Sequence, residues 1–128
     1  MPTFELTTES GENGAVRLRF SGELDIATAP EVEEELRRLE AGAPPVLVLD
    51  LRGLEFMDST GLRTVVAADT RAREAGRRLV VVRGPAAVDR IFTVTQLDER
   101  LEIVEDLAAA EGGSATQPAR APASPPRE

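Results

Sequence analysis

The sequence predicts an α/β protein, a single small domain in which helices pack on a mixed β-sheet. From about residue 28 onward, segments of helical periodicity alternate with apolar runs that suit buried strands. This order implies right-handed βαβ crossovers. Before residue 21, apolar and polar residues alternate instead, which is typical of an antiparallel hairpin and makes the sheet mixed. The length of 128 residues fits one domain.

The predicted hairpin is the first element of the chain. Phe4 and Leu6 alternate with polar residues, and so do Val16, Leu18 and Phe20. The turn-rich stretch SGENG lies between these two strands. The stretch SGELD then ends the alternation and leads toward the first helix.

The first helix is predicted over the stretch TAPEVEEELRRLEAG, residues 28–42. We expect Thr28 to cap its N-terminus, Glu31 to complete a capping box and Pro30 to lie in the first turn. Gly42 is the expected end. The apolar residues recur at spacings of three and four, which places them on one face: Ala29, Val32, Leu36 and Leu39.

Four further elements follow, and their patterns alternate between strand and helix. In chain order they are a strand over Pro45–Leu51, a helix from Gly61 to about Ala75, a strand over Arg78–Val82 and a helix over residues 84–92. Both strands are almost continuously apolar, as expected for strands covered on both faces. The apolar stretch Leu101–Leu107 fits either a strand or a helix.

The last stretch of the chain differs in composition from the rest. Residues 111–128 are rich in Pro, Ala and Gly, and four of the nine prolines lie in the last eleven residues. Such a segment cannot bury a core. We therefore expect a folded domain over residues 1–110 and a disordered tail over residues 111–128.

Composition narrows the chemistry. The chain has no cysteine, histidine or lysine, which excludes thiolate and imidazole metal sites, a Ser-His-Asp triad and a P-loop lysine. We expect no metal, no cofactor and no enzymatic activity. The net charge of −8 disfavours nucleic acid and anionic membranes as partners. No apolar run is long enough to span a membrane and the N-terminus lacks a signal-peptide pattern, so we expect a cytoplasmic protein.

The stretch FMDSTGL, residues 56–62, is the candidate site. Asp58 is expected to cap the second helix, which puts Gly61 inside its first turn. Glycine there costs about 1 kcal/mol relative to alanine. We interpret it as leaving the helix N-terminus bare, so that another molecule can approach the hydroxyl of Ser59. The alternative is an ordinary helix cap in which Ser59 and Thr60 are merely polar.

Three longer stretches carry a family resemblance. FSGELDIATAPEVEEEL, VLVLDLRGLEFMDSTGLRTVV and GPAAVDRIFTVTQL resemble the signature blocks of the STAS domain family, and more narrowly of the bacterial anti-sigma factor antagonists. The resemblance runs from about Phe4 to Leu107 and implies a STAS-like fold. It also implies that the unphosphorylated protein binds an anti-sigma factor and so frees a sigma factor for transcription, in stress response or sporulation.

The same resemblance implies how that binding is switched. The anti-sigma factor of such systems is an ATP-dependent serine kinase, which here would phosphorylate Ser59 and thereby end binding. A separate phosphatase resets the protein, which we expect to be a monomer when free. A phosphate adds about −1.5 to −2 charges beside Asp58. Thr60 is a possible second acceptor, but the resemblance favours Ser59.

The resemblance further implies a partner-binding surface around the start of the second helix. Its residues are Gly22, Glu23, Leu24 and Asp25, together with Asp58, Thr60, Gly61 and Leu62. A STAS adaptor subunit of a transporter or of a sensory assembly is the alternative function. Asp50 resembles the phospho-acceptor at a strand end of response-regulator receivers, but the lysine of that family is absent, so we expect a strand-end or turn residue there.

Overall fold

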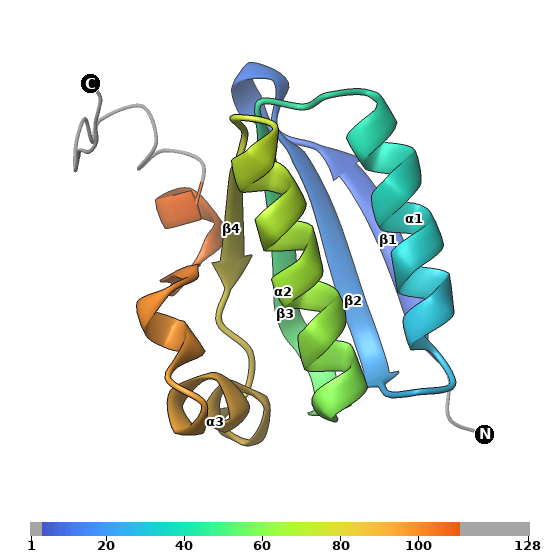
Figure 1. Cartoon of the computed structure of the whole chain (residues 1–128), viewed down its shortest axis with the longest axis vertical. Helices are drawn as coiled ribbons and strands as arrows, with labels where there is room; N and C mark the ends of the chain where they lie inside the picture. The colour runs from blue at the N-terminus through green and yellow to red at the C-terminus, as the bar shows by residue number, and fades with distance from the viewer. Residues whose placement is uncertain (1–3, 111–128) are drawn as a thin grey trace.

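The computed structural model describes residues 4–110, which form one five-stranded sheet with helices packed on it (Figure 1). The strands lie in chain order, β1-β2-β3-β4-β5. The first pair is antiparallel and the other three pairs are parallel. The elements are β1 (Glu5–Ser10), β2 (Val16–Leu24), α1 (Ala29–Ala41), β3 (Val46–Met57), α2 (Ser59–Glu74), β4 (Arg78–Val82), α3 (Ala86–Val94) and β5 (Glu102–Val104), with short 3-10 turns at Glu12–Gly14 and Leu97–Glu99.

The predicted hairpin is confirmed. Strands β1 and β2 pair from Glu5 opposite Ser21 to Ser10 opposite Val16. The 3-10 turn between them reverses the chain through Asn13 and Gly14, whose φ angles are 58° and 83°. Left-handed backbone of this kind suits Asn and Gly, which explains the turn-rich composition at this point.

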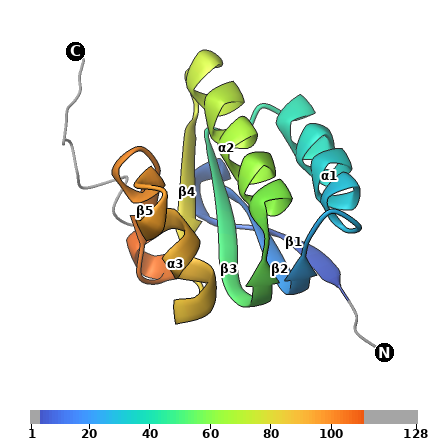
Figure 2. The same ribbon diagram turned by 60° about the horizontal axis from the view of Figure 1, so that its bottom comes forward.

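Helices α1 and α2 lie side by side on one face of the sheet (Figures 1 and 2). Each connects one parallel strand to the next, as the βαβ order of the sequence predicts. The core between the layers is filled by fully buried aliphatic side chains and two phenylalanines. Its largest members are Phe20, Phe92, Leu18, Leu24, Leu36, Leu49, Leu51, Leu54, Val32 and Val65.

The opposite face of the sheet is divided into an apolar part and a charged part. Residues 107–110 are helical, and Leu107 and Ala110 pack there against a second apolar cluster formed by Val48, Val80 and Val82. The stretch Leu101–Leu107, which fitted either a strand or a helix, therefore contains strand β5 and then enters this helical turn. The charged part lies over β1, β2 and β3 and is described below.

The prediction of a disordered tail concerns residues 111–128, which lie outside the described residues.

The end of α1 differs in detail from the prediction. Gly42 ends α1 as predicted, but its own backbone is still right-handed, with a φ of −82°. The left-handed residue that turns the chain toward β3 is Ala43, with a φ of 51°. Among residues 4–110, none of the helices combines the length and apolar character needed to cross a membrane.

Candidate functional site

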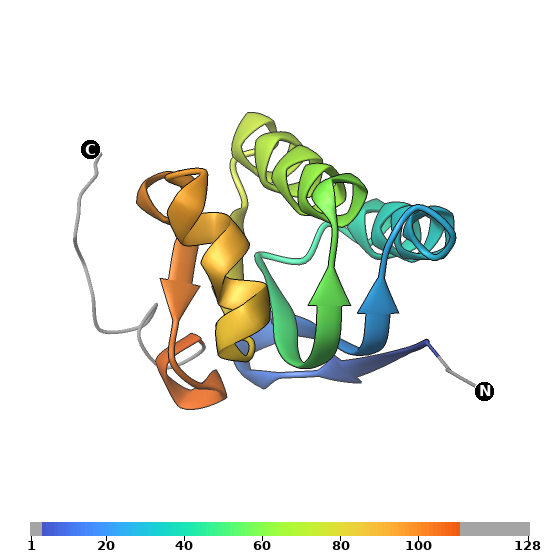
Figure 3. The same ribbon diagram turned by 90° about the horizontal axis from the view of Figure 1, so that it is seen from below.

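Strands β2 and β3 end side by side, and their C-terminal ends lie where α1 and α2 begin (Figure 3). Glu23 lies opposite Phe56 in the strand register, and Leu24 lies opposite Met57. The backbone N–H of Asp58 then donates to the carbonyl oxygen of Leu24 at 3.1 Å. The parallel pairing therefore brings GELD and DSTGL together, although they are more than thirty residues apart in the sequence.

Asp58 caps α2, as the sequence predicted. Its backbone is extended, and its Oδ1 atom accepts a hydrogen bond of 3.0 Å from the backbone N–H of Gly61. A carboxylate here also offsets the partial positive charge of the helix N-terminus. Ser59 is the first residue of α2; it is exposed, and its hydroxyl makes no hydrogen bond with another residue of the described part of the chain.

Gly61 has a different role from the predicted one. The glycine is buried, and a Cβ atom added to it would lie 2.7 Å from Cγ of Leu24 and 2.9 Å from Cγ of Met57. Contacts this short are not tolerated by real side chains. The expectation that Gly61 leaves the helix N-terminus bare for another molecule is therefore wrong. Glycine is needed because the first turn of α2 packs directly on the end of β2.

Several of the predicted partner-binding residues lie beneath the surface. Leu24, Gly61 and Leu62 are buried, and so is Gly22, which has a φ of 102° and adjoins a register shift between β2 and β3. Such a backbone conformation favours glycine. These residues hold the two strand ends and the helix start together. Glu23 is exposed, whereas Asp25, Asp58 and Thr60 are half-buried.

The connection between β2 and α1 is built differently from the predicted capping box. Thr28 makes no side-chain cap to α1. Its hydroxyl accepts from the N–H of Asp25 and donates to the carbonyl of Glu23, both at 2.9 Å. The carboxylate of Asp25 accepts from the N–H groups of Ala27 and Thr28 at 3.0 and 3.2 Å. Asp25 therefore caps the turn that immediately precedes α1. Thr28 cannot take the usual capping position, because its backbone angles are already helical.

Two exposed apolar residues at this edge were missed by the sequence reasoning. Ile26 is 73% exposed in the loop after β2, and Phe56 is 47% exposed near the end of β3. The signal for Ile26 was an isolated apolar residue in the polar loop ELDIAT. We call the whole region the strand-end surface; it comprises Glu23, Asp25, Ile26, Glu55, Phe56, Asp58, Ser59 and Thr60.

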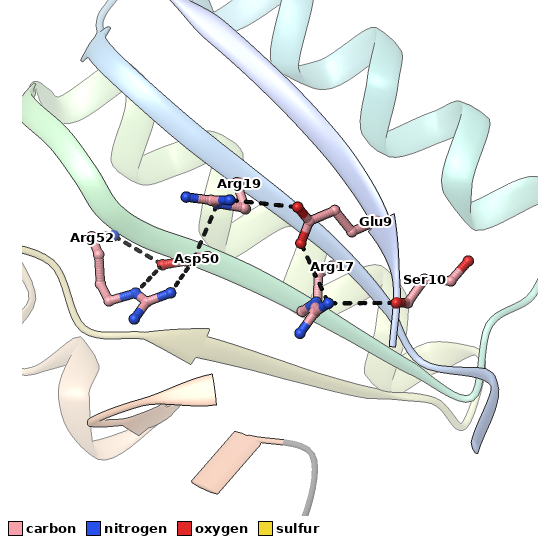
Figure 4. Close-up of polar contacts among 6 residues, drawn as sticks. All are labelled: Glu9, Ser10, Arg17, Arg19, Asp50 and Arg52. Atoms are coloured by element: carbon pink, nitrogen blue, oxygen red, sulfur yellow. Dashed lines mark hydrogen bonds and ion pairs between the residues drawn. The ribbon is translucent and has the colours of Figure 1, made fainter. Parts of the chain in front are cut away.

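Asp50 lies in the middle of β3 and not at a strand end, because β3 continues to Met57. It is buried on the charged part of the sheet (Figure 4). Its carboxylate accepts from Nε and Nη2 of Arg52, both at 2.9 Å, and lies 3.8 Å from Nε of Arg19. Arg19 also pairs with Glu9 of β1 at 3.4 Å. These ion pairs join three strands, so the role of the Asp50 carboxylate is to stabilise the sheet.

The ionisation of Asp50 follows from this network. Burial by itself raises the pKa of the carboxyl, but the hydrogen bonds from Arg52 and the charges of Arg52 and Arg19 outweigh it. The net effect is a lowered pKa, so the carboxylate stays charged at neutral pH. Within residues 4–110 no group of three Asp or Glu side chains is placed to hold a metal ion.

Comparison with known proteins identifies the family. The STAS domain family model matches residues 8–110, which is most of the chain. The chain belongs to the STAS domain family. Its five-stranded mixed sheet and packed helices are also the fold of solved STAS proteins.

The similar proteins are named as regulators of sigma factors. The anti-sigma-F factor antagonist RsfB of Mycobacterium tuberculosis strain H37Rv is 35% identical over 77 residues, which cover 60% of this chain and 63% of RsfB. The anti-sigma-B factor antagonist of Listeria monocytogenes is 36% identical over 83 residues, 65% of this chain and 73% of the relative. The crystal structure of an anti-sigma factor antagonist from Mycobacterium paratuberculosis superimposes on this structure with a TM-score of 0.77 at 28% identity. The superposition covers 87% of this chain and 93% of the M. paratuberculosis chain. The match thus spans a little less than two thirds of RsfB.

The packing of Gly61 gives the first prediction. We expect Gly61→Ala to lower the free energy of unfolding by about 1–3 kcal/mol, because the methyl group overpacks the contact with Leu24 and Met57. Helix propensity alone would favour alanine by about 1 kcal/mol. Gly42→Ala is the matched control, since its Cβ would meet nothing closer than 3.5 Å. Urea unfolding of both variants measures the two free energies of unfolding. A Gly61→Ala protein that is more stable than wild type would contradict the packing account.

The Asp50 network gives the second prediction. A lowered pKa means that the stabilisation is present above the pH at which the unfolded carboxyl titrates, about 3.9, and is lost as pH falls through the folded-state pKa. We expect Asp50→Asn to be less stable than wild type at pH 7 by about 1–3 kcal/mol, with the difference shrinking below about pH 4. Asp98→Asn, at an exposed position, is the control. A constant difference from pH 7 to pH 3 would contradict the assignment.

Proposed function

We propose that this STAS domain is an anti-sigma factor antagonist that binds its partner through the strand-end surface and is switched by phosphorylation of Ser59. The observation that carries the proposal is an exposed serine at the start of α2, whose hydroxyl makes no hydrogen bond with another described residue, at the same end of the sheet as the exposed residues Ile26 and Phe56. The similarity to the anti-sigma factor antagonists of M. tuberculosis and L. monocytogenes supports it. The proposed action is binding alone, in the cytoplasm, without a cofactor.

The strand-end surface favours a particular kind of partner. Ile26 and Phe56 offer apolar area that a partner can bury, and exposed apolar anchors of this kind supply much of the binding energy of interfaces. Glu23, Glu55 and Asp58 lie in the same strand-end stretches and add negative charge to this end of the sheet. A complementary face on the anti-sigma factor therefore carries an apolar pocket with basic side chains at its rim.

Ser59 meets the requirements of a kinase substrate. Its oxygen can attack the γ-phosphorus of ATP in line: the Oγ–P bond forms, the bond from phosphorus to the β,γ-bridging oxygen breaks, ADP leaves, and the hydroxyl proton passes to a base. The anti-sigma factor supplies the kinase in this proposal, and a separate phosphatase hydrolyses the phosphoserine. Thr60 is the second residue of α2 and is half-buried, so its hydroxyl is less accessible to a kinase than that of Ser59.

The phosphate would prevent docking by desolvation. A phosphoserine carries about −1.5 to −2 charges at neutral pH and keeps a strongly bound hydration shell. Burying it in an interface built on Ile26 and Phe56, next to Asp58, costs more than the surrounding basic rim returns. Because Asp58 and Gly61 hold the helix start in place independently of Ser59, the fold itself is expected to survive the modification.

The third prediction concerns the acceptor. On incubation with ATP and lysate of the native cells, we expect a single phosphate on the wild-type chain, mapped to Ser59 by mass spectrometry. Ser59→Ala should abolish the modification, whereas Thr60→Ala should retain it. Phosphate on Thr60, or unchanged phosphorylation of Ser59→Ala, would show that another hydroxyl is the substrate.

The fourth prediction concerns the apolar anchor. We expect Ile26→Ser to weaken binding to the captured anti-sigma factor by about tenfold or more, since loss of a central apolar anchor costs more than 1 kcal/mol. Val94→Ser is a matched control, because Val94 is an aliphatic residue of similar exposure, 72% against 73%, and lies in a different element, at the end of α3. Equal affinities of the two variants, measured by titration calorimetry, would rule out Ile26 as an anchor.

A further inference from the structure

Arg63 differs from most arginines of this protein. Arginines on β2, α1, β3 and the second half of α2 form ion pairs with carboxylates, such as Arg52 with Asp50 and Arg71 with Glu40. Arg63 lies on α2 and is exposed, and its guanidinium makes no hydrogen bond or ion pair with any other residue between 4 and 110. An unpaired guanidinium on this acidic chain is available for an anion.

Arg63 lies four residues after Ser59 on the same helix. Residues at this spacing are neighbours on a helix surface, with their Cβ atoms about 5–6 Å apart. Because the Cα–Cβ bonds of a helix tilt toward its N-terminus, the long side chain of Arg63 can reach back over the turn that begins with Ser59. An anion N-terminal to a cation at this spacing is the favourable order.

The surroundings of Ser59 compensate the charge of a phosphate only in part. Glu55 and Asp58 are close in the chain and carry negative charge, and neither pairs with an arginine in the described part of the protein. The backbone N–H of Gly61, which could otherwise bind an anion at the helix start, already donates to Asp58. The partial positive charge of the helix N-terminus favours a phosphate on Ser59, but Asp58 already offsets part of it and both carboxylates repel the phosphate, so a nearby cation adds to the stabilisation.

We propose that Arg63 is the intramolecular counter-ion of phospho-Ser59, so that phosphorylation creates an ion pair across the first turn of α2. The inference rests on the proposed phosphorylation of Ser59. The pair favours the dianionic phosphate, stabilises the start of α2 in the phosphorylated state and holds the phosphate along the flank of the helix. Arg63 is thus a positioning residue for the switched-off form.

The test measures the phosphate directly and requires neither kinase nor anti-sigma factor. Phosphoserine is installed at position 59 during translation, in the wild-type chain and in Arg63→Gln, Arg63→Lys and Arg77→Gln. Phosphorus NMR then follows the phosphate from pH 4 to pH 9. The guanidinium of the control residue Arg77 also lacks a partner among residues 4–110, but Arg77 lies beyond the other end of α2.

We expect the phosphate of the wild-type chain to titrate at a lower pH than that of Arg63→Gln, by about 0.2–0.4 pH unit, the size expected for a single pair at this spacing. Arg63→Lys should keep most of this shift and Arg77→Gln all of it. The shift should shrink at high salt because an exposed pair is screened. Phosphorylation should also raise the melting temperature more in wild type than in Arg63→Gln.

Identical titration midpoints for the wild-type chain and Arg63→Gln would overturn the proposal. The result is separable from the proposed function. If Arg63 does not pair with the phosphate but phosphorylation of Ser59 still ends partner binding, only the present inference fails. If the pair forms but no anti-sigma factor is bound or released, the proposed function fails and the ion pair stands.

Discussion

The contact between the end of β2 and the first turn of α2 determines the geometry of the candidate site. Parallel pairing places Leu24 opposite Met57, and the N–H of Asp58 donates to the carbonyl of Leu24. The absence of a side chain at Gly61 then lets the helix pack on Leu24 at a distance that no other residue permits. Two short stretches distant in the sequence become one rigid surface through these contacts, and Ser59 is held on its outer side.

This arrangement separates the residues that build the surface from those that a partner can touch. The buried glycines and leucines of the GELD and DSTGL stretches fix the backbone. Asp25 and Asp58 use their carboxylates on backbone N–H groups at the two helix starts. What remains for recognition is the exposed set around Ile26, Phe56 and Ser59. A modification at Ser59 can thus alter binding without loosening the packing below it.

Much of the fold could be predicted from local patterns. Alternation identified the hairpin, apolar runs identified β3 and β4, and the cap at Asp58 was correct because it depends only on adjacent residues. The errors arose where contacts outside the helix itself decide. Thr28 was expected to cap α1, but bonds to Glu23 and Asp25 from the preceding strand end occupy its hydroxyl. The role of Gly61 depends on Leu24, which is 37 positions away in the sequence and invisible to a local pattern. Likewise, Phe56 is 47% exposed although it is paired with Glu23 inside the sheet, which its neighbours in sequence do not indicate.

The central claim is that the strand-end surface binds an anti-sigma factor only while Ser59 is unmodified. Its most direct test is capture from lysate of the native cells on Ser59→Ala and Ser59→Asp baits side by side, with identification of the bound proteins by mass spectrometry. The account predicts that a serine kinase with anti-sigma activity is retained by the alanine bait and lost from the aspartate bait, while both baits show the same thermal unfolding. Equal retention of that kinase on two equally folded baits, or capture of transporter subunits by both, would contradict it.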